Sequence, residues 1–155
     1  MSLATRLAAD LHSANFTVDA LTDLWGPDAA AALHRGQRVP ALRSLGPTSP
    51  LSTLATAFVL GLPVPPASLD VALPTLTFRG AVELGLVDES GAPLLDLRPY
   101  SVVDSRGVAS WWIASDLGEL ALGHAIPEHH VLGVGGASTT LSGIMLSTPV
   151  DRALD

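Results

Sequence analysis

Hydrophobic residues recur at a four-residue spacing at the start of the chain, where alanines and polar residues separate Leu3, Leu7 and Leu11. This spacing places the three leucines on one face of a helix. A few residues beyond it, Thr17 fits the N-cap of a second helix, because its hydroxyl can accept a hydrogen bond from a backbone N–H of the first turn. Gly26 is expected to end that second helix.

Apolar stretches interrupted by glycine and proline predict the remaining helices. Leu51 to Leu60 is apolar almost all round, which favours a buried helix. Pro74 is expected to open a helix that runs through Leu84, with Gly85 as its C-terminal cap. Shorter helices are expected over residues 27–34, from Pro40 onward, and over residues 68–73.

The hydrophobic pattern changes after Gly85, and short strands are predicted from there. Leu86-Val87 reads as a strand, residues 89–91 as a turn, and residues 94–100 as the returning strand of a hairpin. Residues 102–103 and 111–115 add further strand segments. A helix that runs directly into a hairpin is the element order of a winged helix. The sequence therefore predicts an α+β fold, with an N-terminal helical bundle, a winged-helix-like unit and a small antiparallel sheet.

Composition narrows the classes of function. The formal net charge is -7, with eight arginines and no lysine, and an acidic surface disfavours non-specific binding to nucleic acid. The absence of cysteine excludes disulfides and thiolate chemistry. The longest apolar stretch is well short of the roughly 20 residues that span a bilayer, so we expect no membrane association and a cytoplasmic location. Charged residues make up only 15%, which reflects either the alanine content or a surface that another domain covers.

The winged-helix order raises the possibility of DNA binding, and the charges argue against it. A DNA-reading winged helix presents basic and amide side chains on its recognition helix and wing. Here the expected recognition helix carries Arg79 but also Glu83, and the expected wing has Asp88 and Glu89 at its tip. A stand-alone DNA-binding module and a protein-interaction module both stay open, and the charges favour the second.

Two aromatic residues and three histidines are further candidates for chemistry. Trp111 and Trp112 would point to opposite sides of a strand, so one is expected in the core and the other at an interface or the rim of a pocket. His124, His129 and His130 lie close together, but their spacing does not place two ligands on one side of a helix or strand. Metal binding is therefore disfavoured.

A glycine-rich stretch, G-x-G-G over residues 133–136, precedes a cluster of hydroxyl residues. Glycines allow backbone amides to approach an anion, and Ser138 or Thr139 could cap a following helix. The dinucleotide fingerprint also needs a preceding strand, a further glycine spacing and a downstream acidic residue, and this pattern is incomplete. On spacing alone, the stretch is a turn before a capped helix.

Three stretches resemble the N-terminal region of a group of actinobacterial methyltransferases. These are class I S-adenosylmethionine-dependent enzymes of the "methyltransferase small" type, similar to the release-factor glutamine methyltransferases. The resemblance covers roughly the last 60 residues, and upstream only the helical pattern and the length agree. The stretches are Asp96-Leu97-Arg98-Pro99-Tyr100, Trp111-Trp112-Ile113-Ala114-Ser115-Asp116-Leu117-Gly118 and His130-Val131-Leu132-Gly133-Val134-Gly135-Gly136-Ala137-Ser138-Thr139-Thr140-Leu141.

The resemblance implies a division of the chain into three parts. Residues 1–122 would form the substrate-recognition domain, residues 123–148 a linker with the glycine-rich loop and a short helix, and residues 149–155 the first strand of a Rossmann-like methyltransferase domain. The family's cofactor motif, D-x-G-x-G, would begin at Asp155, where the sequence stops. S-adenosylmethionine would then be bound mainly by a C-terminal domain that these residues lack, and the 155 residues alone would be inactive.

The resemblance also suggests site residues and partners. In the family, the segment that corresponds to the glycine-rich stretch lies near the mouth of the active site. It implies substrate contacts from Gly135, Gly136, Ser138, Thr139 and Thr140, although the threonines could instead only cap a helix. It assigns no catalytic residue within these 155 positions. The expected partners are the chain's own methyltransferase domain and a methyl acceptor, either a glutamine of a release-factor-like protein or a base nitrogen in RNA.

Overall fold

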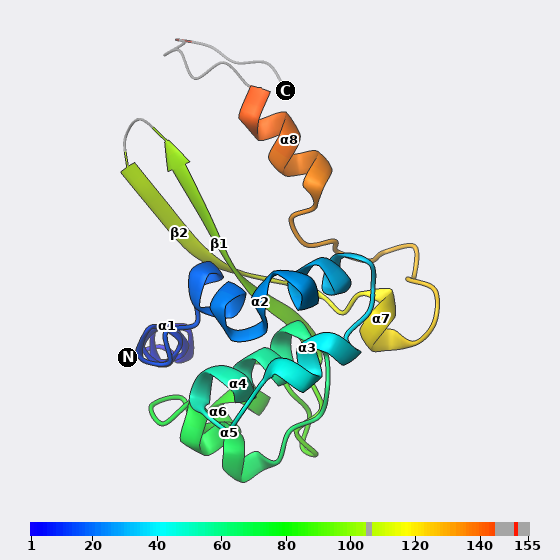
Figure 1. Ribbon diagram of the computed structural model, residues 1–155. Coiled ribbons are helices and arrows are strands. Elements are labelled where there is room, and N and C mark those ends of the chain that lie inside the picture. Colours follow the sequence, from blue (N-terminus) through cyan, green and yellow to red (C-terminus); the bar gives the residue numbers. More distant parts are fainter. Residues whose placement is uncertain (105–106, 145–150, 152–155) are drawn as a thin grey trace.

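The computed structural model describes residues 1–104, 107–144 and 151 (Figure 1). Most of the described helices come first in the chain, an antiparallel hairpin follows them and further short helices come after it, so the α+β class predicted from the sequence is confirmed. The elements are α1 (Leu3–Ser13), α2 (Val18–His34), α3 (Val39–Ser44), α4 (Pro50–Leu54), the π-helix η1 (Ala55–Val59), α5 (Pro66–Ala72), α6 (Thr77–Glu83), β1 (Leu95–Asp104), β2 (Gly107–Asp116), α7 (Glu119–Leu122) and α8 (Gly136–Ile144).

The first two helices begin at hydroxyl caps. The Ser2 side chain accepts a hydrogen bond from the Thr5 N–H, and Thr17 Oγ1 accepts one from the Ala20 N–H at 3.2 Å. These bonds satisfy backbone donors that have no partner within the helix. Gly26 (φ 71°, ψ 171°) interrupts α2, and helical structure resumes at Pro27. The predicted N-cap at Thr17 and the predicted break at Gly26 are both confirmed.

The apolar stretch from Leu51 to Leu60 forms the centre of the core, as predicted, but its second half is a π-helix rather than an α-helix. The Leu60 N–H donates to the Ala55 carbonyl, five residues back, at 3.0 Å. Nearly every residue of this stretch is buried. The largest fully buried apolar side chains of the core are Phe16, Phe58, Leu11, Leu54, Leu60, Leu69, Leu73, Leu76 and Val87.

Helix α6 begins at Thr77 and not at Pro74, so the predicted start of this helix is wrong by three residues. Thr77 itself has a positive φ of 67°, which interrupts a helix that would run on from Pro74. Asp10, a buried residue of α1, binds the backbone just before Thr77. Its carboxylate accepts hydrogen bonds from the Thr75 N–H, at 3.0 and 3.1 Å, and from the Leu76 N–H at 2.7 Å. This side chain takes the backbone donors that precede α6 and ties α1 to the start of α6.

The hairpin predicted between residues 86–87 and 94–100 is reduced to one isolated bridge, Val87 to Pro93. Instead, β1 pairs with β2 over ten residues, from Leu95 opposite Asp116 to Asp104 opposite Gly107. The short turn before β1 does not stand out as a wing, because the Gly91 carbonyl accepts a hydrogen bond from the Val64 N–H at 3.1 Å. Strand segments 102–103 and 111–115, which were predicted separately, belong to this longer hairpin.

The far half of the hairpin extends beyond the helices, and α8 projects from the body of the molecule (Figure 1). Helix α7 packs back on the body: Arg38 donates hydrogen bonds to both the Leu60 and the Leu120 carbonyl oxygens. Of the predicted strand over residues 149–155, only Asp151 is described, so that prediction lies outside the described residues. In the described part of the chain, every helix is too short or too polar to cross a membrane.

Candidate functional site

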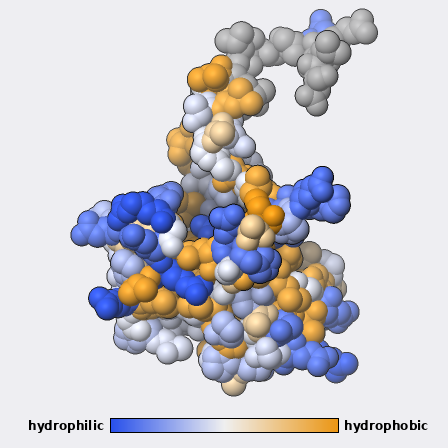
Figure 2. Space-filling model, turned by 90° about the vertical axis from the view of Figure 1, so that its right-hand side faces the viewer, coloured by the Kyte–Doolittle hydropathy of each residue, from blue (hydrophilic) through white to orange (hydrophobic). Residues whose placement is uncertain are grey.

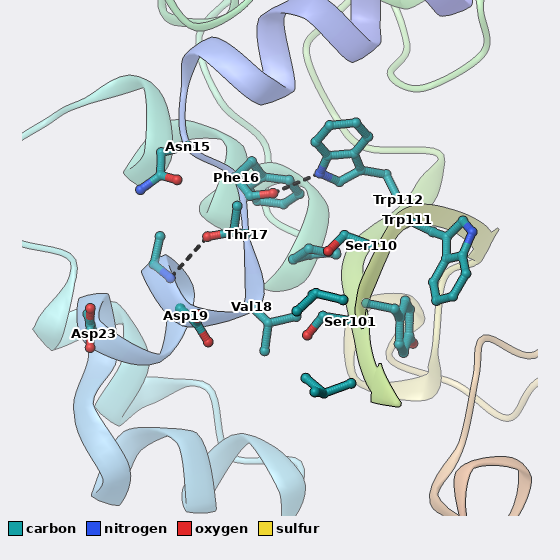
Figure 3. A pocket seen from close by; sticks show the side chains of 15 residues that line it. Asn15, Phe16, Thr17, Val18, Asp19, Asp23, Ser101, Ser110, Trp111 and Trp112 are labelled. Carbon is teal, nitrogen blue, oxygen red and sulfur yellow. Dashed lines mark hydrogen bonds between the residues drawn. The ribbon is translucent and has the colours of Figure 1, made fainter. Parts of the chain in front are cut away.

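A cavity of about 530 Å³ lies between the start of α2 and the β1–β2 hairpin (Figure 3). We call it the α2–hairpin groove. One wall comes from the α1–α2 loop and the first turns of α2, and the other comes from the hairpin. Its lining residues are Asn15, Phe16, Thr17, Val18, Asp19, Ala20, Asp23, Pro99, Tyr100, Ser101, Val103, Val108, Ser110, Trp111 and Trp112.

The helical wall carries the charge of the groove. Asp19 and Asp23 are both exposed, and their four-residue spacing places them on the same side of α2. The Thr17 cap fixes where α2 begins and therefore where these carboxylates lie. Among the residues that the structure describes, no arginine or histidine forms an ion pair with either carboxylate. The charged side chains of the groove lining are thus both negative.

The hairpin wall follows from strand alternation. Pro99, Ser101 and Val103 share one face with Ser110 and Trp112, since residues two apart on a strand point to the same side. Figure 3 shows Ser101 and Ser110 on the side of the strands that faces Val18. The groove therefore combines hydroxyl and apolar side chains on this wall.

Trp112 closes the inner end of the groove. Its indole Nε1–H donates a hydrogen bond of 2.7 Å to the Phe16 carbonyl, and its ring packs against the core. Trp111, on the opposite face, is 51% exposed and points away from α2 (Figure 3). The predicted division of the tryptophan pair, one in the core and one at a surface, is confirmed.

The opposite face of the hairpin holds the segment that follows α7. The Asp116 N–H donates to the Val131 carbonyl at 3.0 Å, and the Val131 N–H donates to Asp116 Oδ2 at 2.9 Å. Further along, the Tyr100 hydroxyl donates to the Val134 carbonyl at 3.2 Å. A Cβ on Gly133 would lie 3.0 Å from Ser115 Oγ, so a glycine lets this segment lie close to the strand. We call Tyr100, Val102, Trp111 and residues 131–134 the hairpin–arm face.

An ion pair anchors the base of the hairpin to the core. Arg98 Nε donates to both carboxylate oxygens of Asp96, at 2.8 and 2.9 Å, and Arg98 Nη2 donates to the Val59 carbonyl of the π-helix at 3.2 Å. Burial raises the pKa of the Asp96 carboxyl above its ordinary value, and the Arg98 guanidinium only partly opposes that rise. The pair is therefore a structural contact at the edge of the core.

The structure places the site residues predicted from the resemblance on an exposed segment. Gly135 precedes α8, and Gly136, Ser138, Thr139 and Thr140 lie in its first turns, all of them exposed and none lining the groove. Thr139 Oγ1 donates to the Gly136 carbonyl at 2.9 Å, a bond within the helix and not an N-terminal cap. A Cβ on Gly135 or Gly136 would have open space around it. Asp155 lies outside the described residues.

The histidines do not gather into a metal site. His130 has a nearly buried side chain with Nδ1 3.9 Å from Asp116 Oδ2, whereas His124 and His129 are exposed. Across residues 1–104, 107–144 and 151, no three His, Cys, Asp or Glu residues are placed to hold a metal ion. The glycine-rich stretch follows a loop instead of a buried strand, so it does not match the strand–loop–helix arrangement of a dinucleotide-binding site.

Sequence reasoning missed the groove itself. No role was predicted from the sequence for Asp19 or Asp23, and Ser101 and Ser110 lay just outside the predicted strand segments. Two signals were available: a pair of carboxylates one helical turn apart directly after a predicted N-cap, and a serine beside each of two predicted strand segments. Neither signal predicts that the start of α2 and the hairpin lie next to each other.

The fold and the groove define an α+β domain of short helices with a projecting hairpin and an acidic groove beside it. The chain belongs to the family described as a domain of unknown function, DUF7059, whose model matches residues 13–98. No curated protein and no solved structure matches the chain. The matched range includes the helical wall of the groove and ends within β1, and the family description names no activity.

Proposed function

We propose that this chain is the substrate-recognition domain of an S-adenosylmethionine-dependent methyltransferase. The observation that supports this most is the arrangement of the three stretches that resemble such enzymes. Residues 96–100 on β1 pair with residues 111–115 on β2, and residues 131–134 attach to the same hairpin through Asp116 and Tyr100. Stretches that are separate in the sequence thus form one contiguous unit.

The surface of this unit supports a role in contacting another domain. On the hairpin–arm face, Val102 is 50% exposed and Trp111 51% exposed, and Leu132 of the arm is 72% exposed. Figure 2 shows hydrophobic residues on the segment that projects from the body, where Leu141 and Ile144 of α8 are exposed. Apolar surface of this extent is typical of interaction sites. In the proposal, this surface faces the catalytic domain, and that domain binds S-adenosylmethionine.

The methyl acceptor in this proposal is a protein, and the enzyme acts in the cytoplasm. The net charge of -7 and the two carboxylates of the groove disfavour phosphate-rich ligands. The alternative of a DNA-binding winged helix has less support. The short turn that would form the wing is tied to Val64, and Asp88 within it is a carboxylate.

The proposal is tested on the complete protein that the gene encodes. This protein is incubated with tritiated S-adenosylmethionine and a ribosome-free cell extract, and the label is counted in the protein and RNA fractions. We expect label in protein. Trp111→Ala should lower transfer by about tenfold, because Trp111 is the large aromatic side chain of the hairpin–arm face that the catalytic domain would cover. Val71→Ala, at an exposed position of α5, is the matched control. Label in neither fraction would contradict the proposal.

A further inference from the structure

We propose that the α2–hairpin groove binds a cationic side chain, arginine or lysine, on an extended segment of a protein partner. This inference rests on the proposed function in one respect: it takes that protein partner to be the methyl acceptor. The volume of the groove, its charge and the chemistry of its two walls support the binding of a cationic side chain.

The charge of the groove calls for a positive ligand. Asp19 and Asp23 are one helical turn apart and exposed, and like charges at this spacing repel each other. The helix dipole stabilises Asp19, which lies in the first turn of α2, but this effect fades beyond that turn. The helix dipole therefore does not offset the negative charge of Asp23. A bound guanidinium or ammonium group would relieve the repulsion between the two.

The shape and lining of the groove fit the rest of such a side chain. Arginine and lysine carry a long apolar stem that packs along apolar surface while the charged head stays near water. Val18 on one wall and Pro99 and Trp112 on the other provide that apolar surface. Ser101 and Ser110 provide hydroxyl acceptors on the wall opposite the carboxylates (Figure 3).

The volume and the openness to solvent favour a peptide segment over a compact ion. A cavity of about 530 Å³ is far larger than one cation needs and is within the range of sites for small organic groups. A nucleic-acid strand would bring phosphates next to Asp19 and Asp23, and the described lining residues include no cation to offset them. Charge complementarity thus selects a basic protein segment as the occupant.

The experiment titrates the ¹⁵N-labelled 155-residue chain with acetyl-Gly-Arg-Gly-Arg-Gly-amide in low salt and follows amide and indole resonances. The Trp112 indole N–H is the specific reporter, because it lies at the inner end of the groove. We expect saturable shifts at Asp19, Asp23 and this indole, with a dissociation constant on the order of 1 mM. The Trp25 indole, which belongs to the core and not to the groove lining, should not shift.

Variants assign the binding to the carboxylates. The double variant Asp19→Asn with Asp23→Asn should weaken binding by about threefold to tenfold, as expected for two partly exposed ion pairs. Asp28→Asn is the matched control, because Asp28 is exposed on the same helix but does not line the groove. Circular dichroism confirms that each variant is folded, and a variant that unfolds is replaced by Asp23→Asn alone.

Several outcomes overturn the inference: absence of saturable shifts, equal binding by the double variant, or equal binding of the neutral peptide acetyl-Gly-Gln-Gly-Gln-Gly-amide. Tighter binding of a decauridine oligonucleotide at the same residues would also overturn it. The measurement needs no S-adenosylmethionine, so its failure leaves the proposed methyltransferase role standing. Conversely, peptide binding without any methyl transfer would remove the proposed function and keep the groove.

Discussion

Asp10 shows how one buried carboxylate can tie together helices that are distant in the sequence. It is 2% exposed and accepts hydrogen bonds from the two backbone N–H groups that precede α6. Asp10→Ala would leave these donors without a partner and should lower the free energy of unfolding by about 3 kcal/mol. Asp10→Asn keeps a carbonyl acceptor and should cost about 1 kcal/mol. Urea unfolding measures both.

The control for Asp10 is Asp28→Ala, because Asp28 is exposed and its side chain makes no hydrogen bond with the described residues. It should change the free energy of unfolding by no more than about 0.5 kcal/mol. Equal effects of Asp10→Ala and Asp28→Ala would contradict the role assigned to Asp10.

Asp88 and Asp96 should titrate in opposite directions. The Ser90 hydroxyl, and then the backbone N–H groups of Ala92 and Ser90, lower the pKa of Asp88 below its ordinary value of 3.8. The ionised carboxylate therefore stabilises the turn above pH 3.8, and that stabilisation is lost as the pH falls through the lowered pKa. Burial raises the pKa of Asp96, so its contribution to stability falls as the pH rises from 3.8 through the raised pKa.

The measurement is a ¹³C titration of the side-chain carboxyl groups. Ser90→Ala should move the pKa of Asp88 upward toward its ordinary value and leave that of Asp96 unchanged, since Asp96 makes no hydrogen bond with Ser90. An unchanged pKa of Asp88 in this variant would show that the hydroxyl is not the main cause of its shift.

At the scale of elements, Gly91 holds the turn before β1 against the helices. Its φ is +87°, and a Cβ there would lie 2.1 Å from the Val64 carbonyl oxygen. Gly91→Ala should therefore lower the free energy of unfolding by about 3 kcal/mol through backbone strain and displacement of the turn. Gly143→Ala in α8 is the same substitution in open space and should be neutral or stabilising by up to about 1 kcal/mol. Thermal unfolding distinguishes the two, and similar effects would contradict the assignment.

The helices of this chain were predictable because their signals are local. The Thr17 cap, the break at Gly26 and the apolar stretch from residue 51 to residue 60 each act within a few residues. The pairing of β1 was not predictable in the same way. Residues 94–100 could pair with either neighbouring strand segment, and the local pattern does not decide between the two.

At the scale of the whole molecule, the groove depends on contacts between residues that are distant in the sequence. Phe16 and Trp112 are joined by a hydrogen bond across 96 positions, and that bond brings the start of α2 next to the hairpin. No spacing or motif encodes such a distance. The glycine-rich stretch was recognisable from its residues, but its exposure just before α8 followed only from the three-dimensional arrangement.

The central claim is that this domain belongs to an S-adenosylmethionine-dependent methyltransferase, and the most direct test is cofactor binding. S-adenosylmethionine is titrated into the complete product of the gene by isothermal calorimetry. We expect one saturable site with a dissociation constant on the order of 10 μM, unchanged in the Trp111→Ala variant. Absence of binding at millimolar cofactor would contradict the claim and leave a protein-binding domain with an acidic groove.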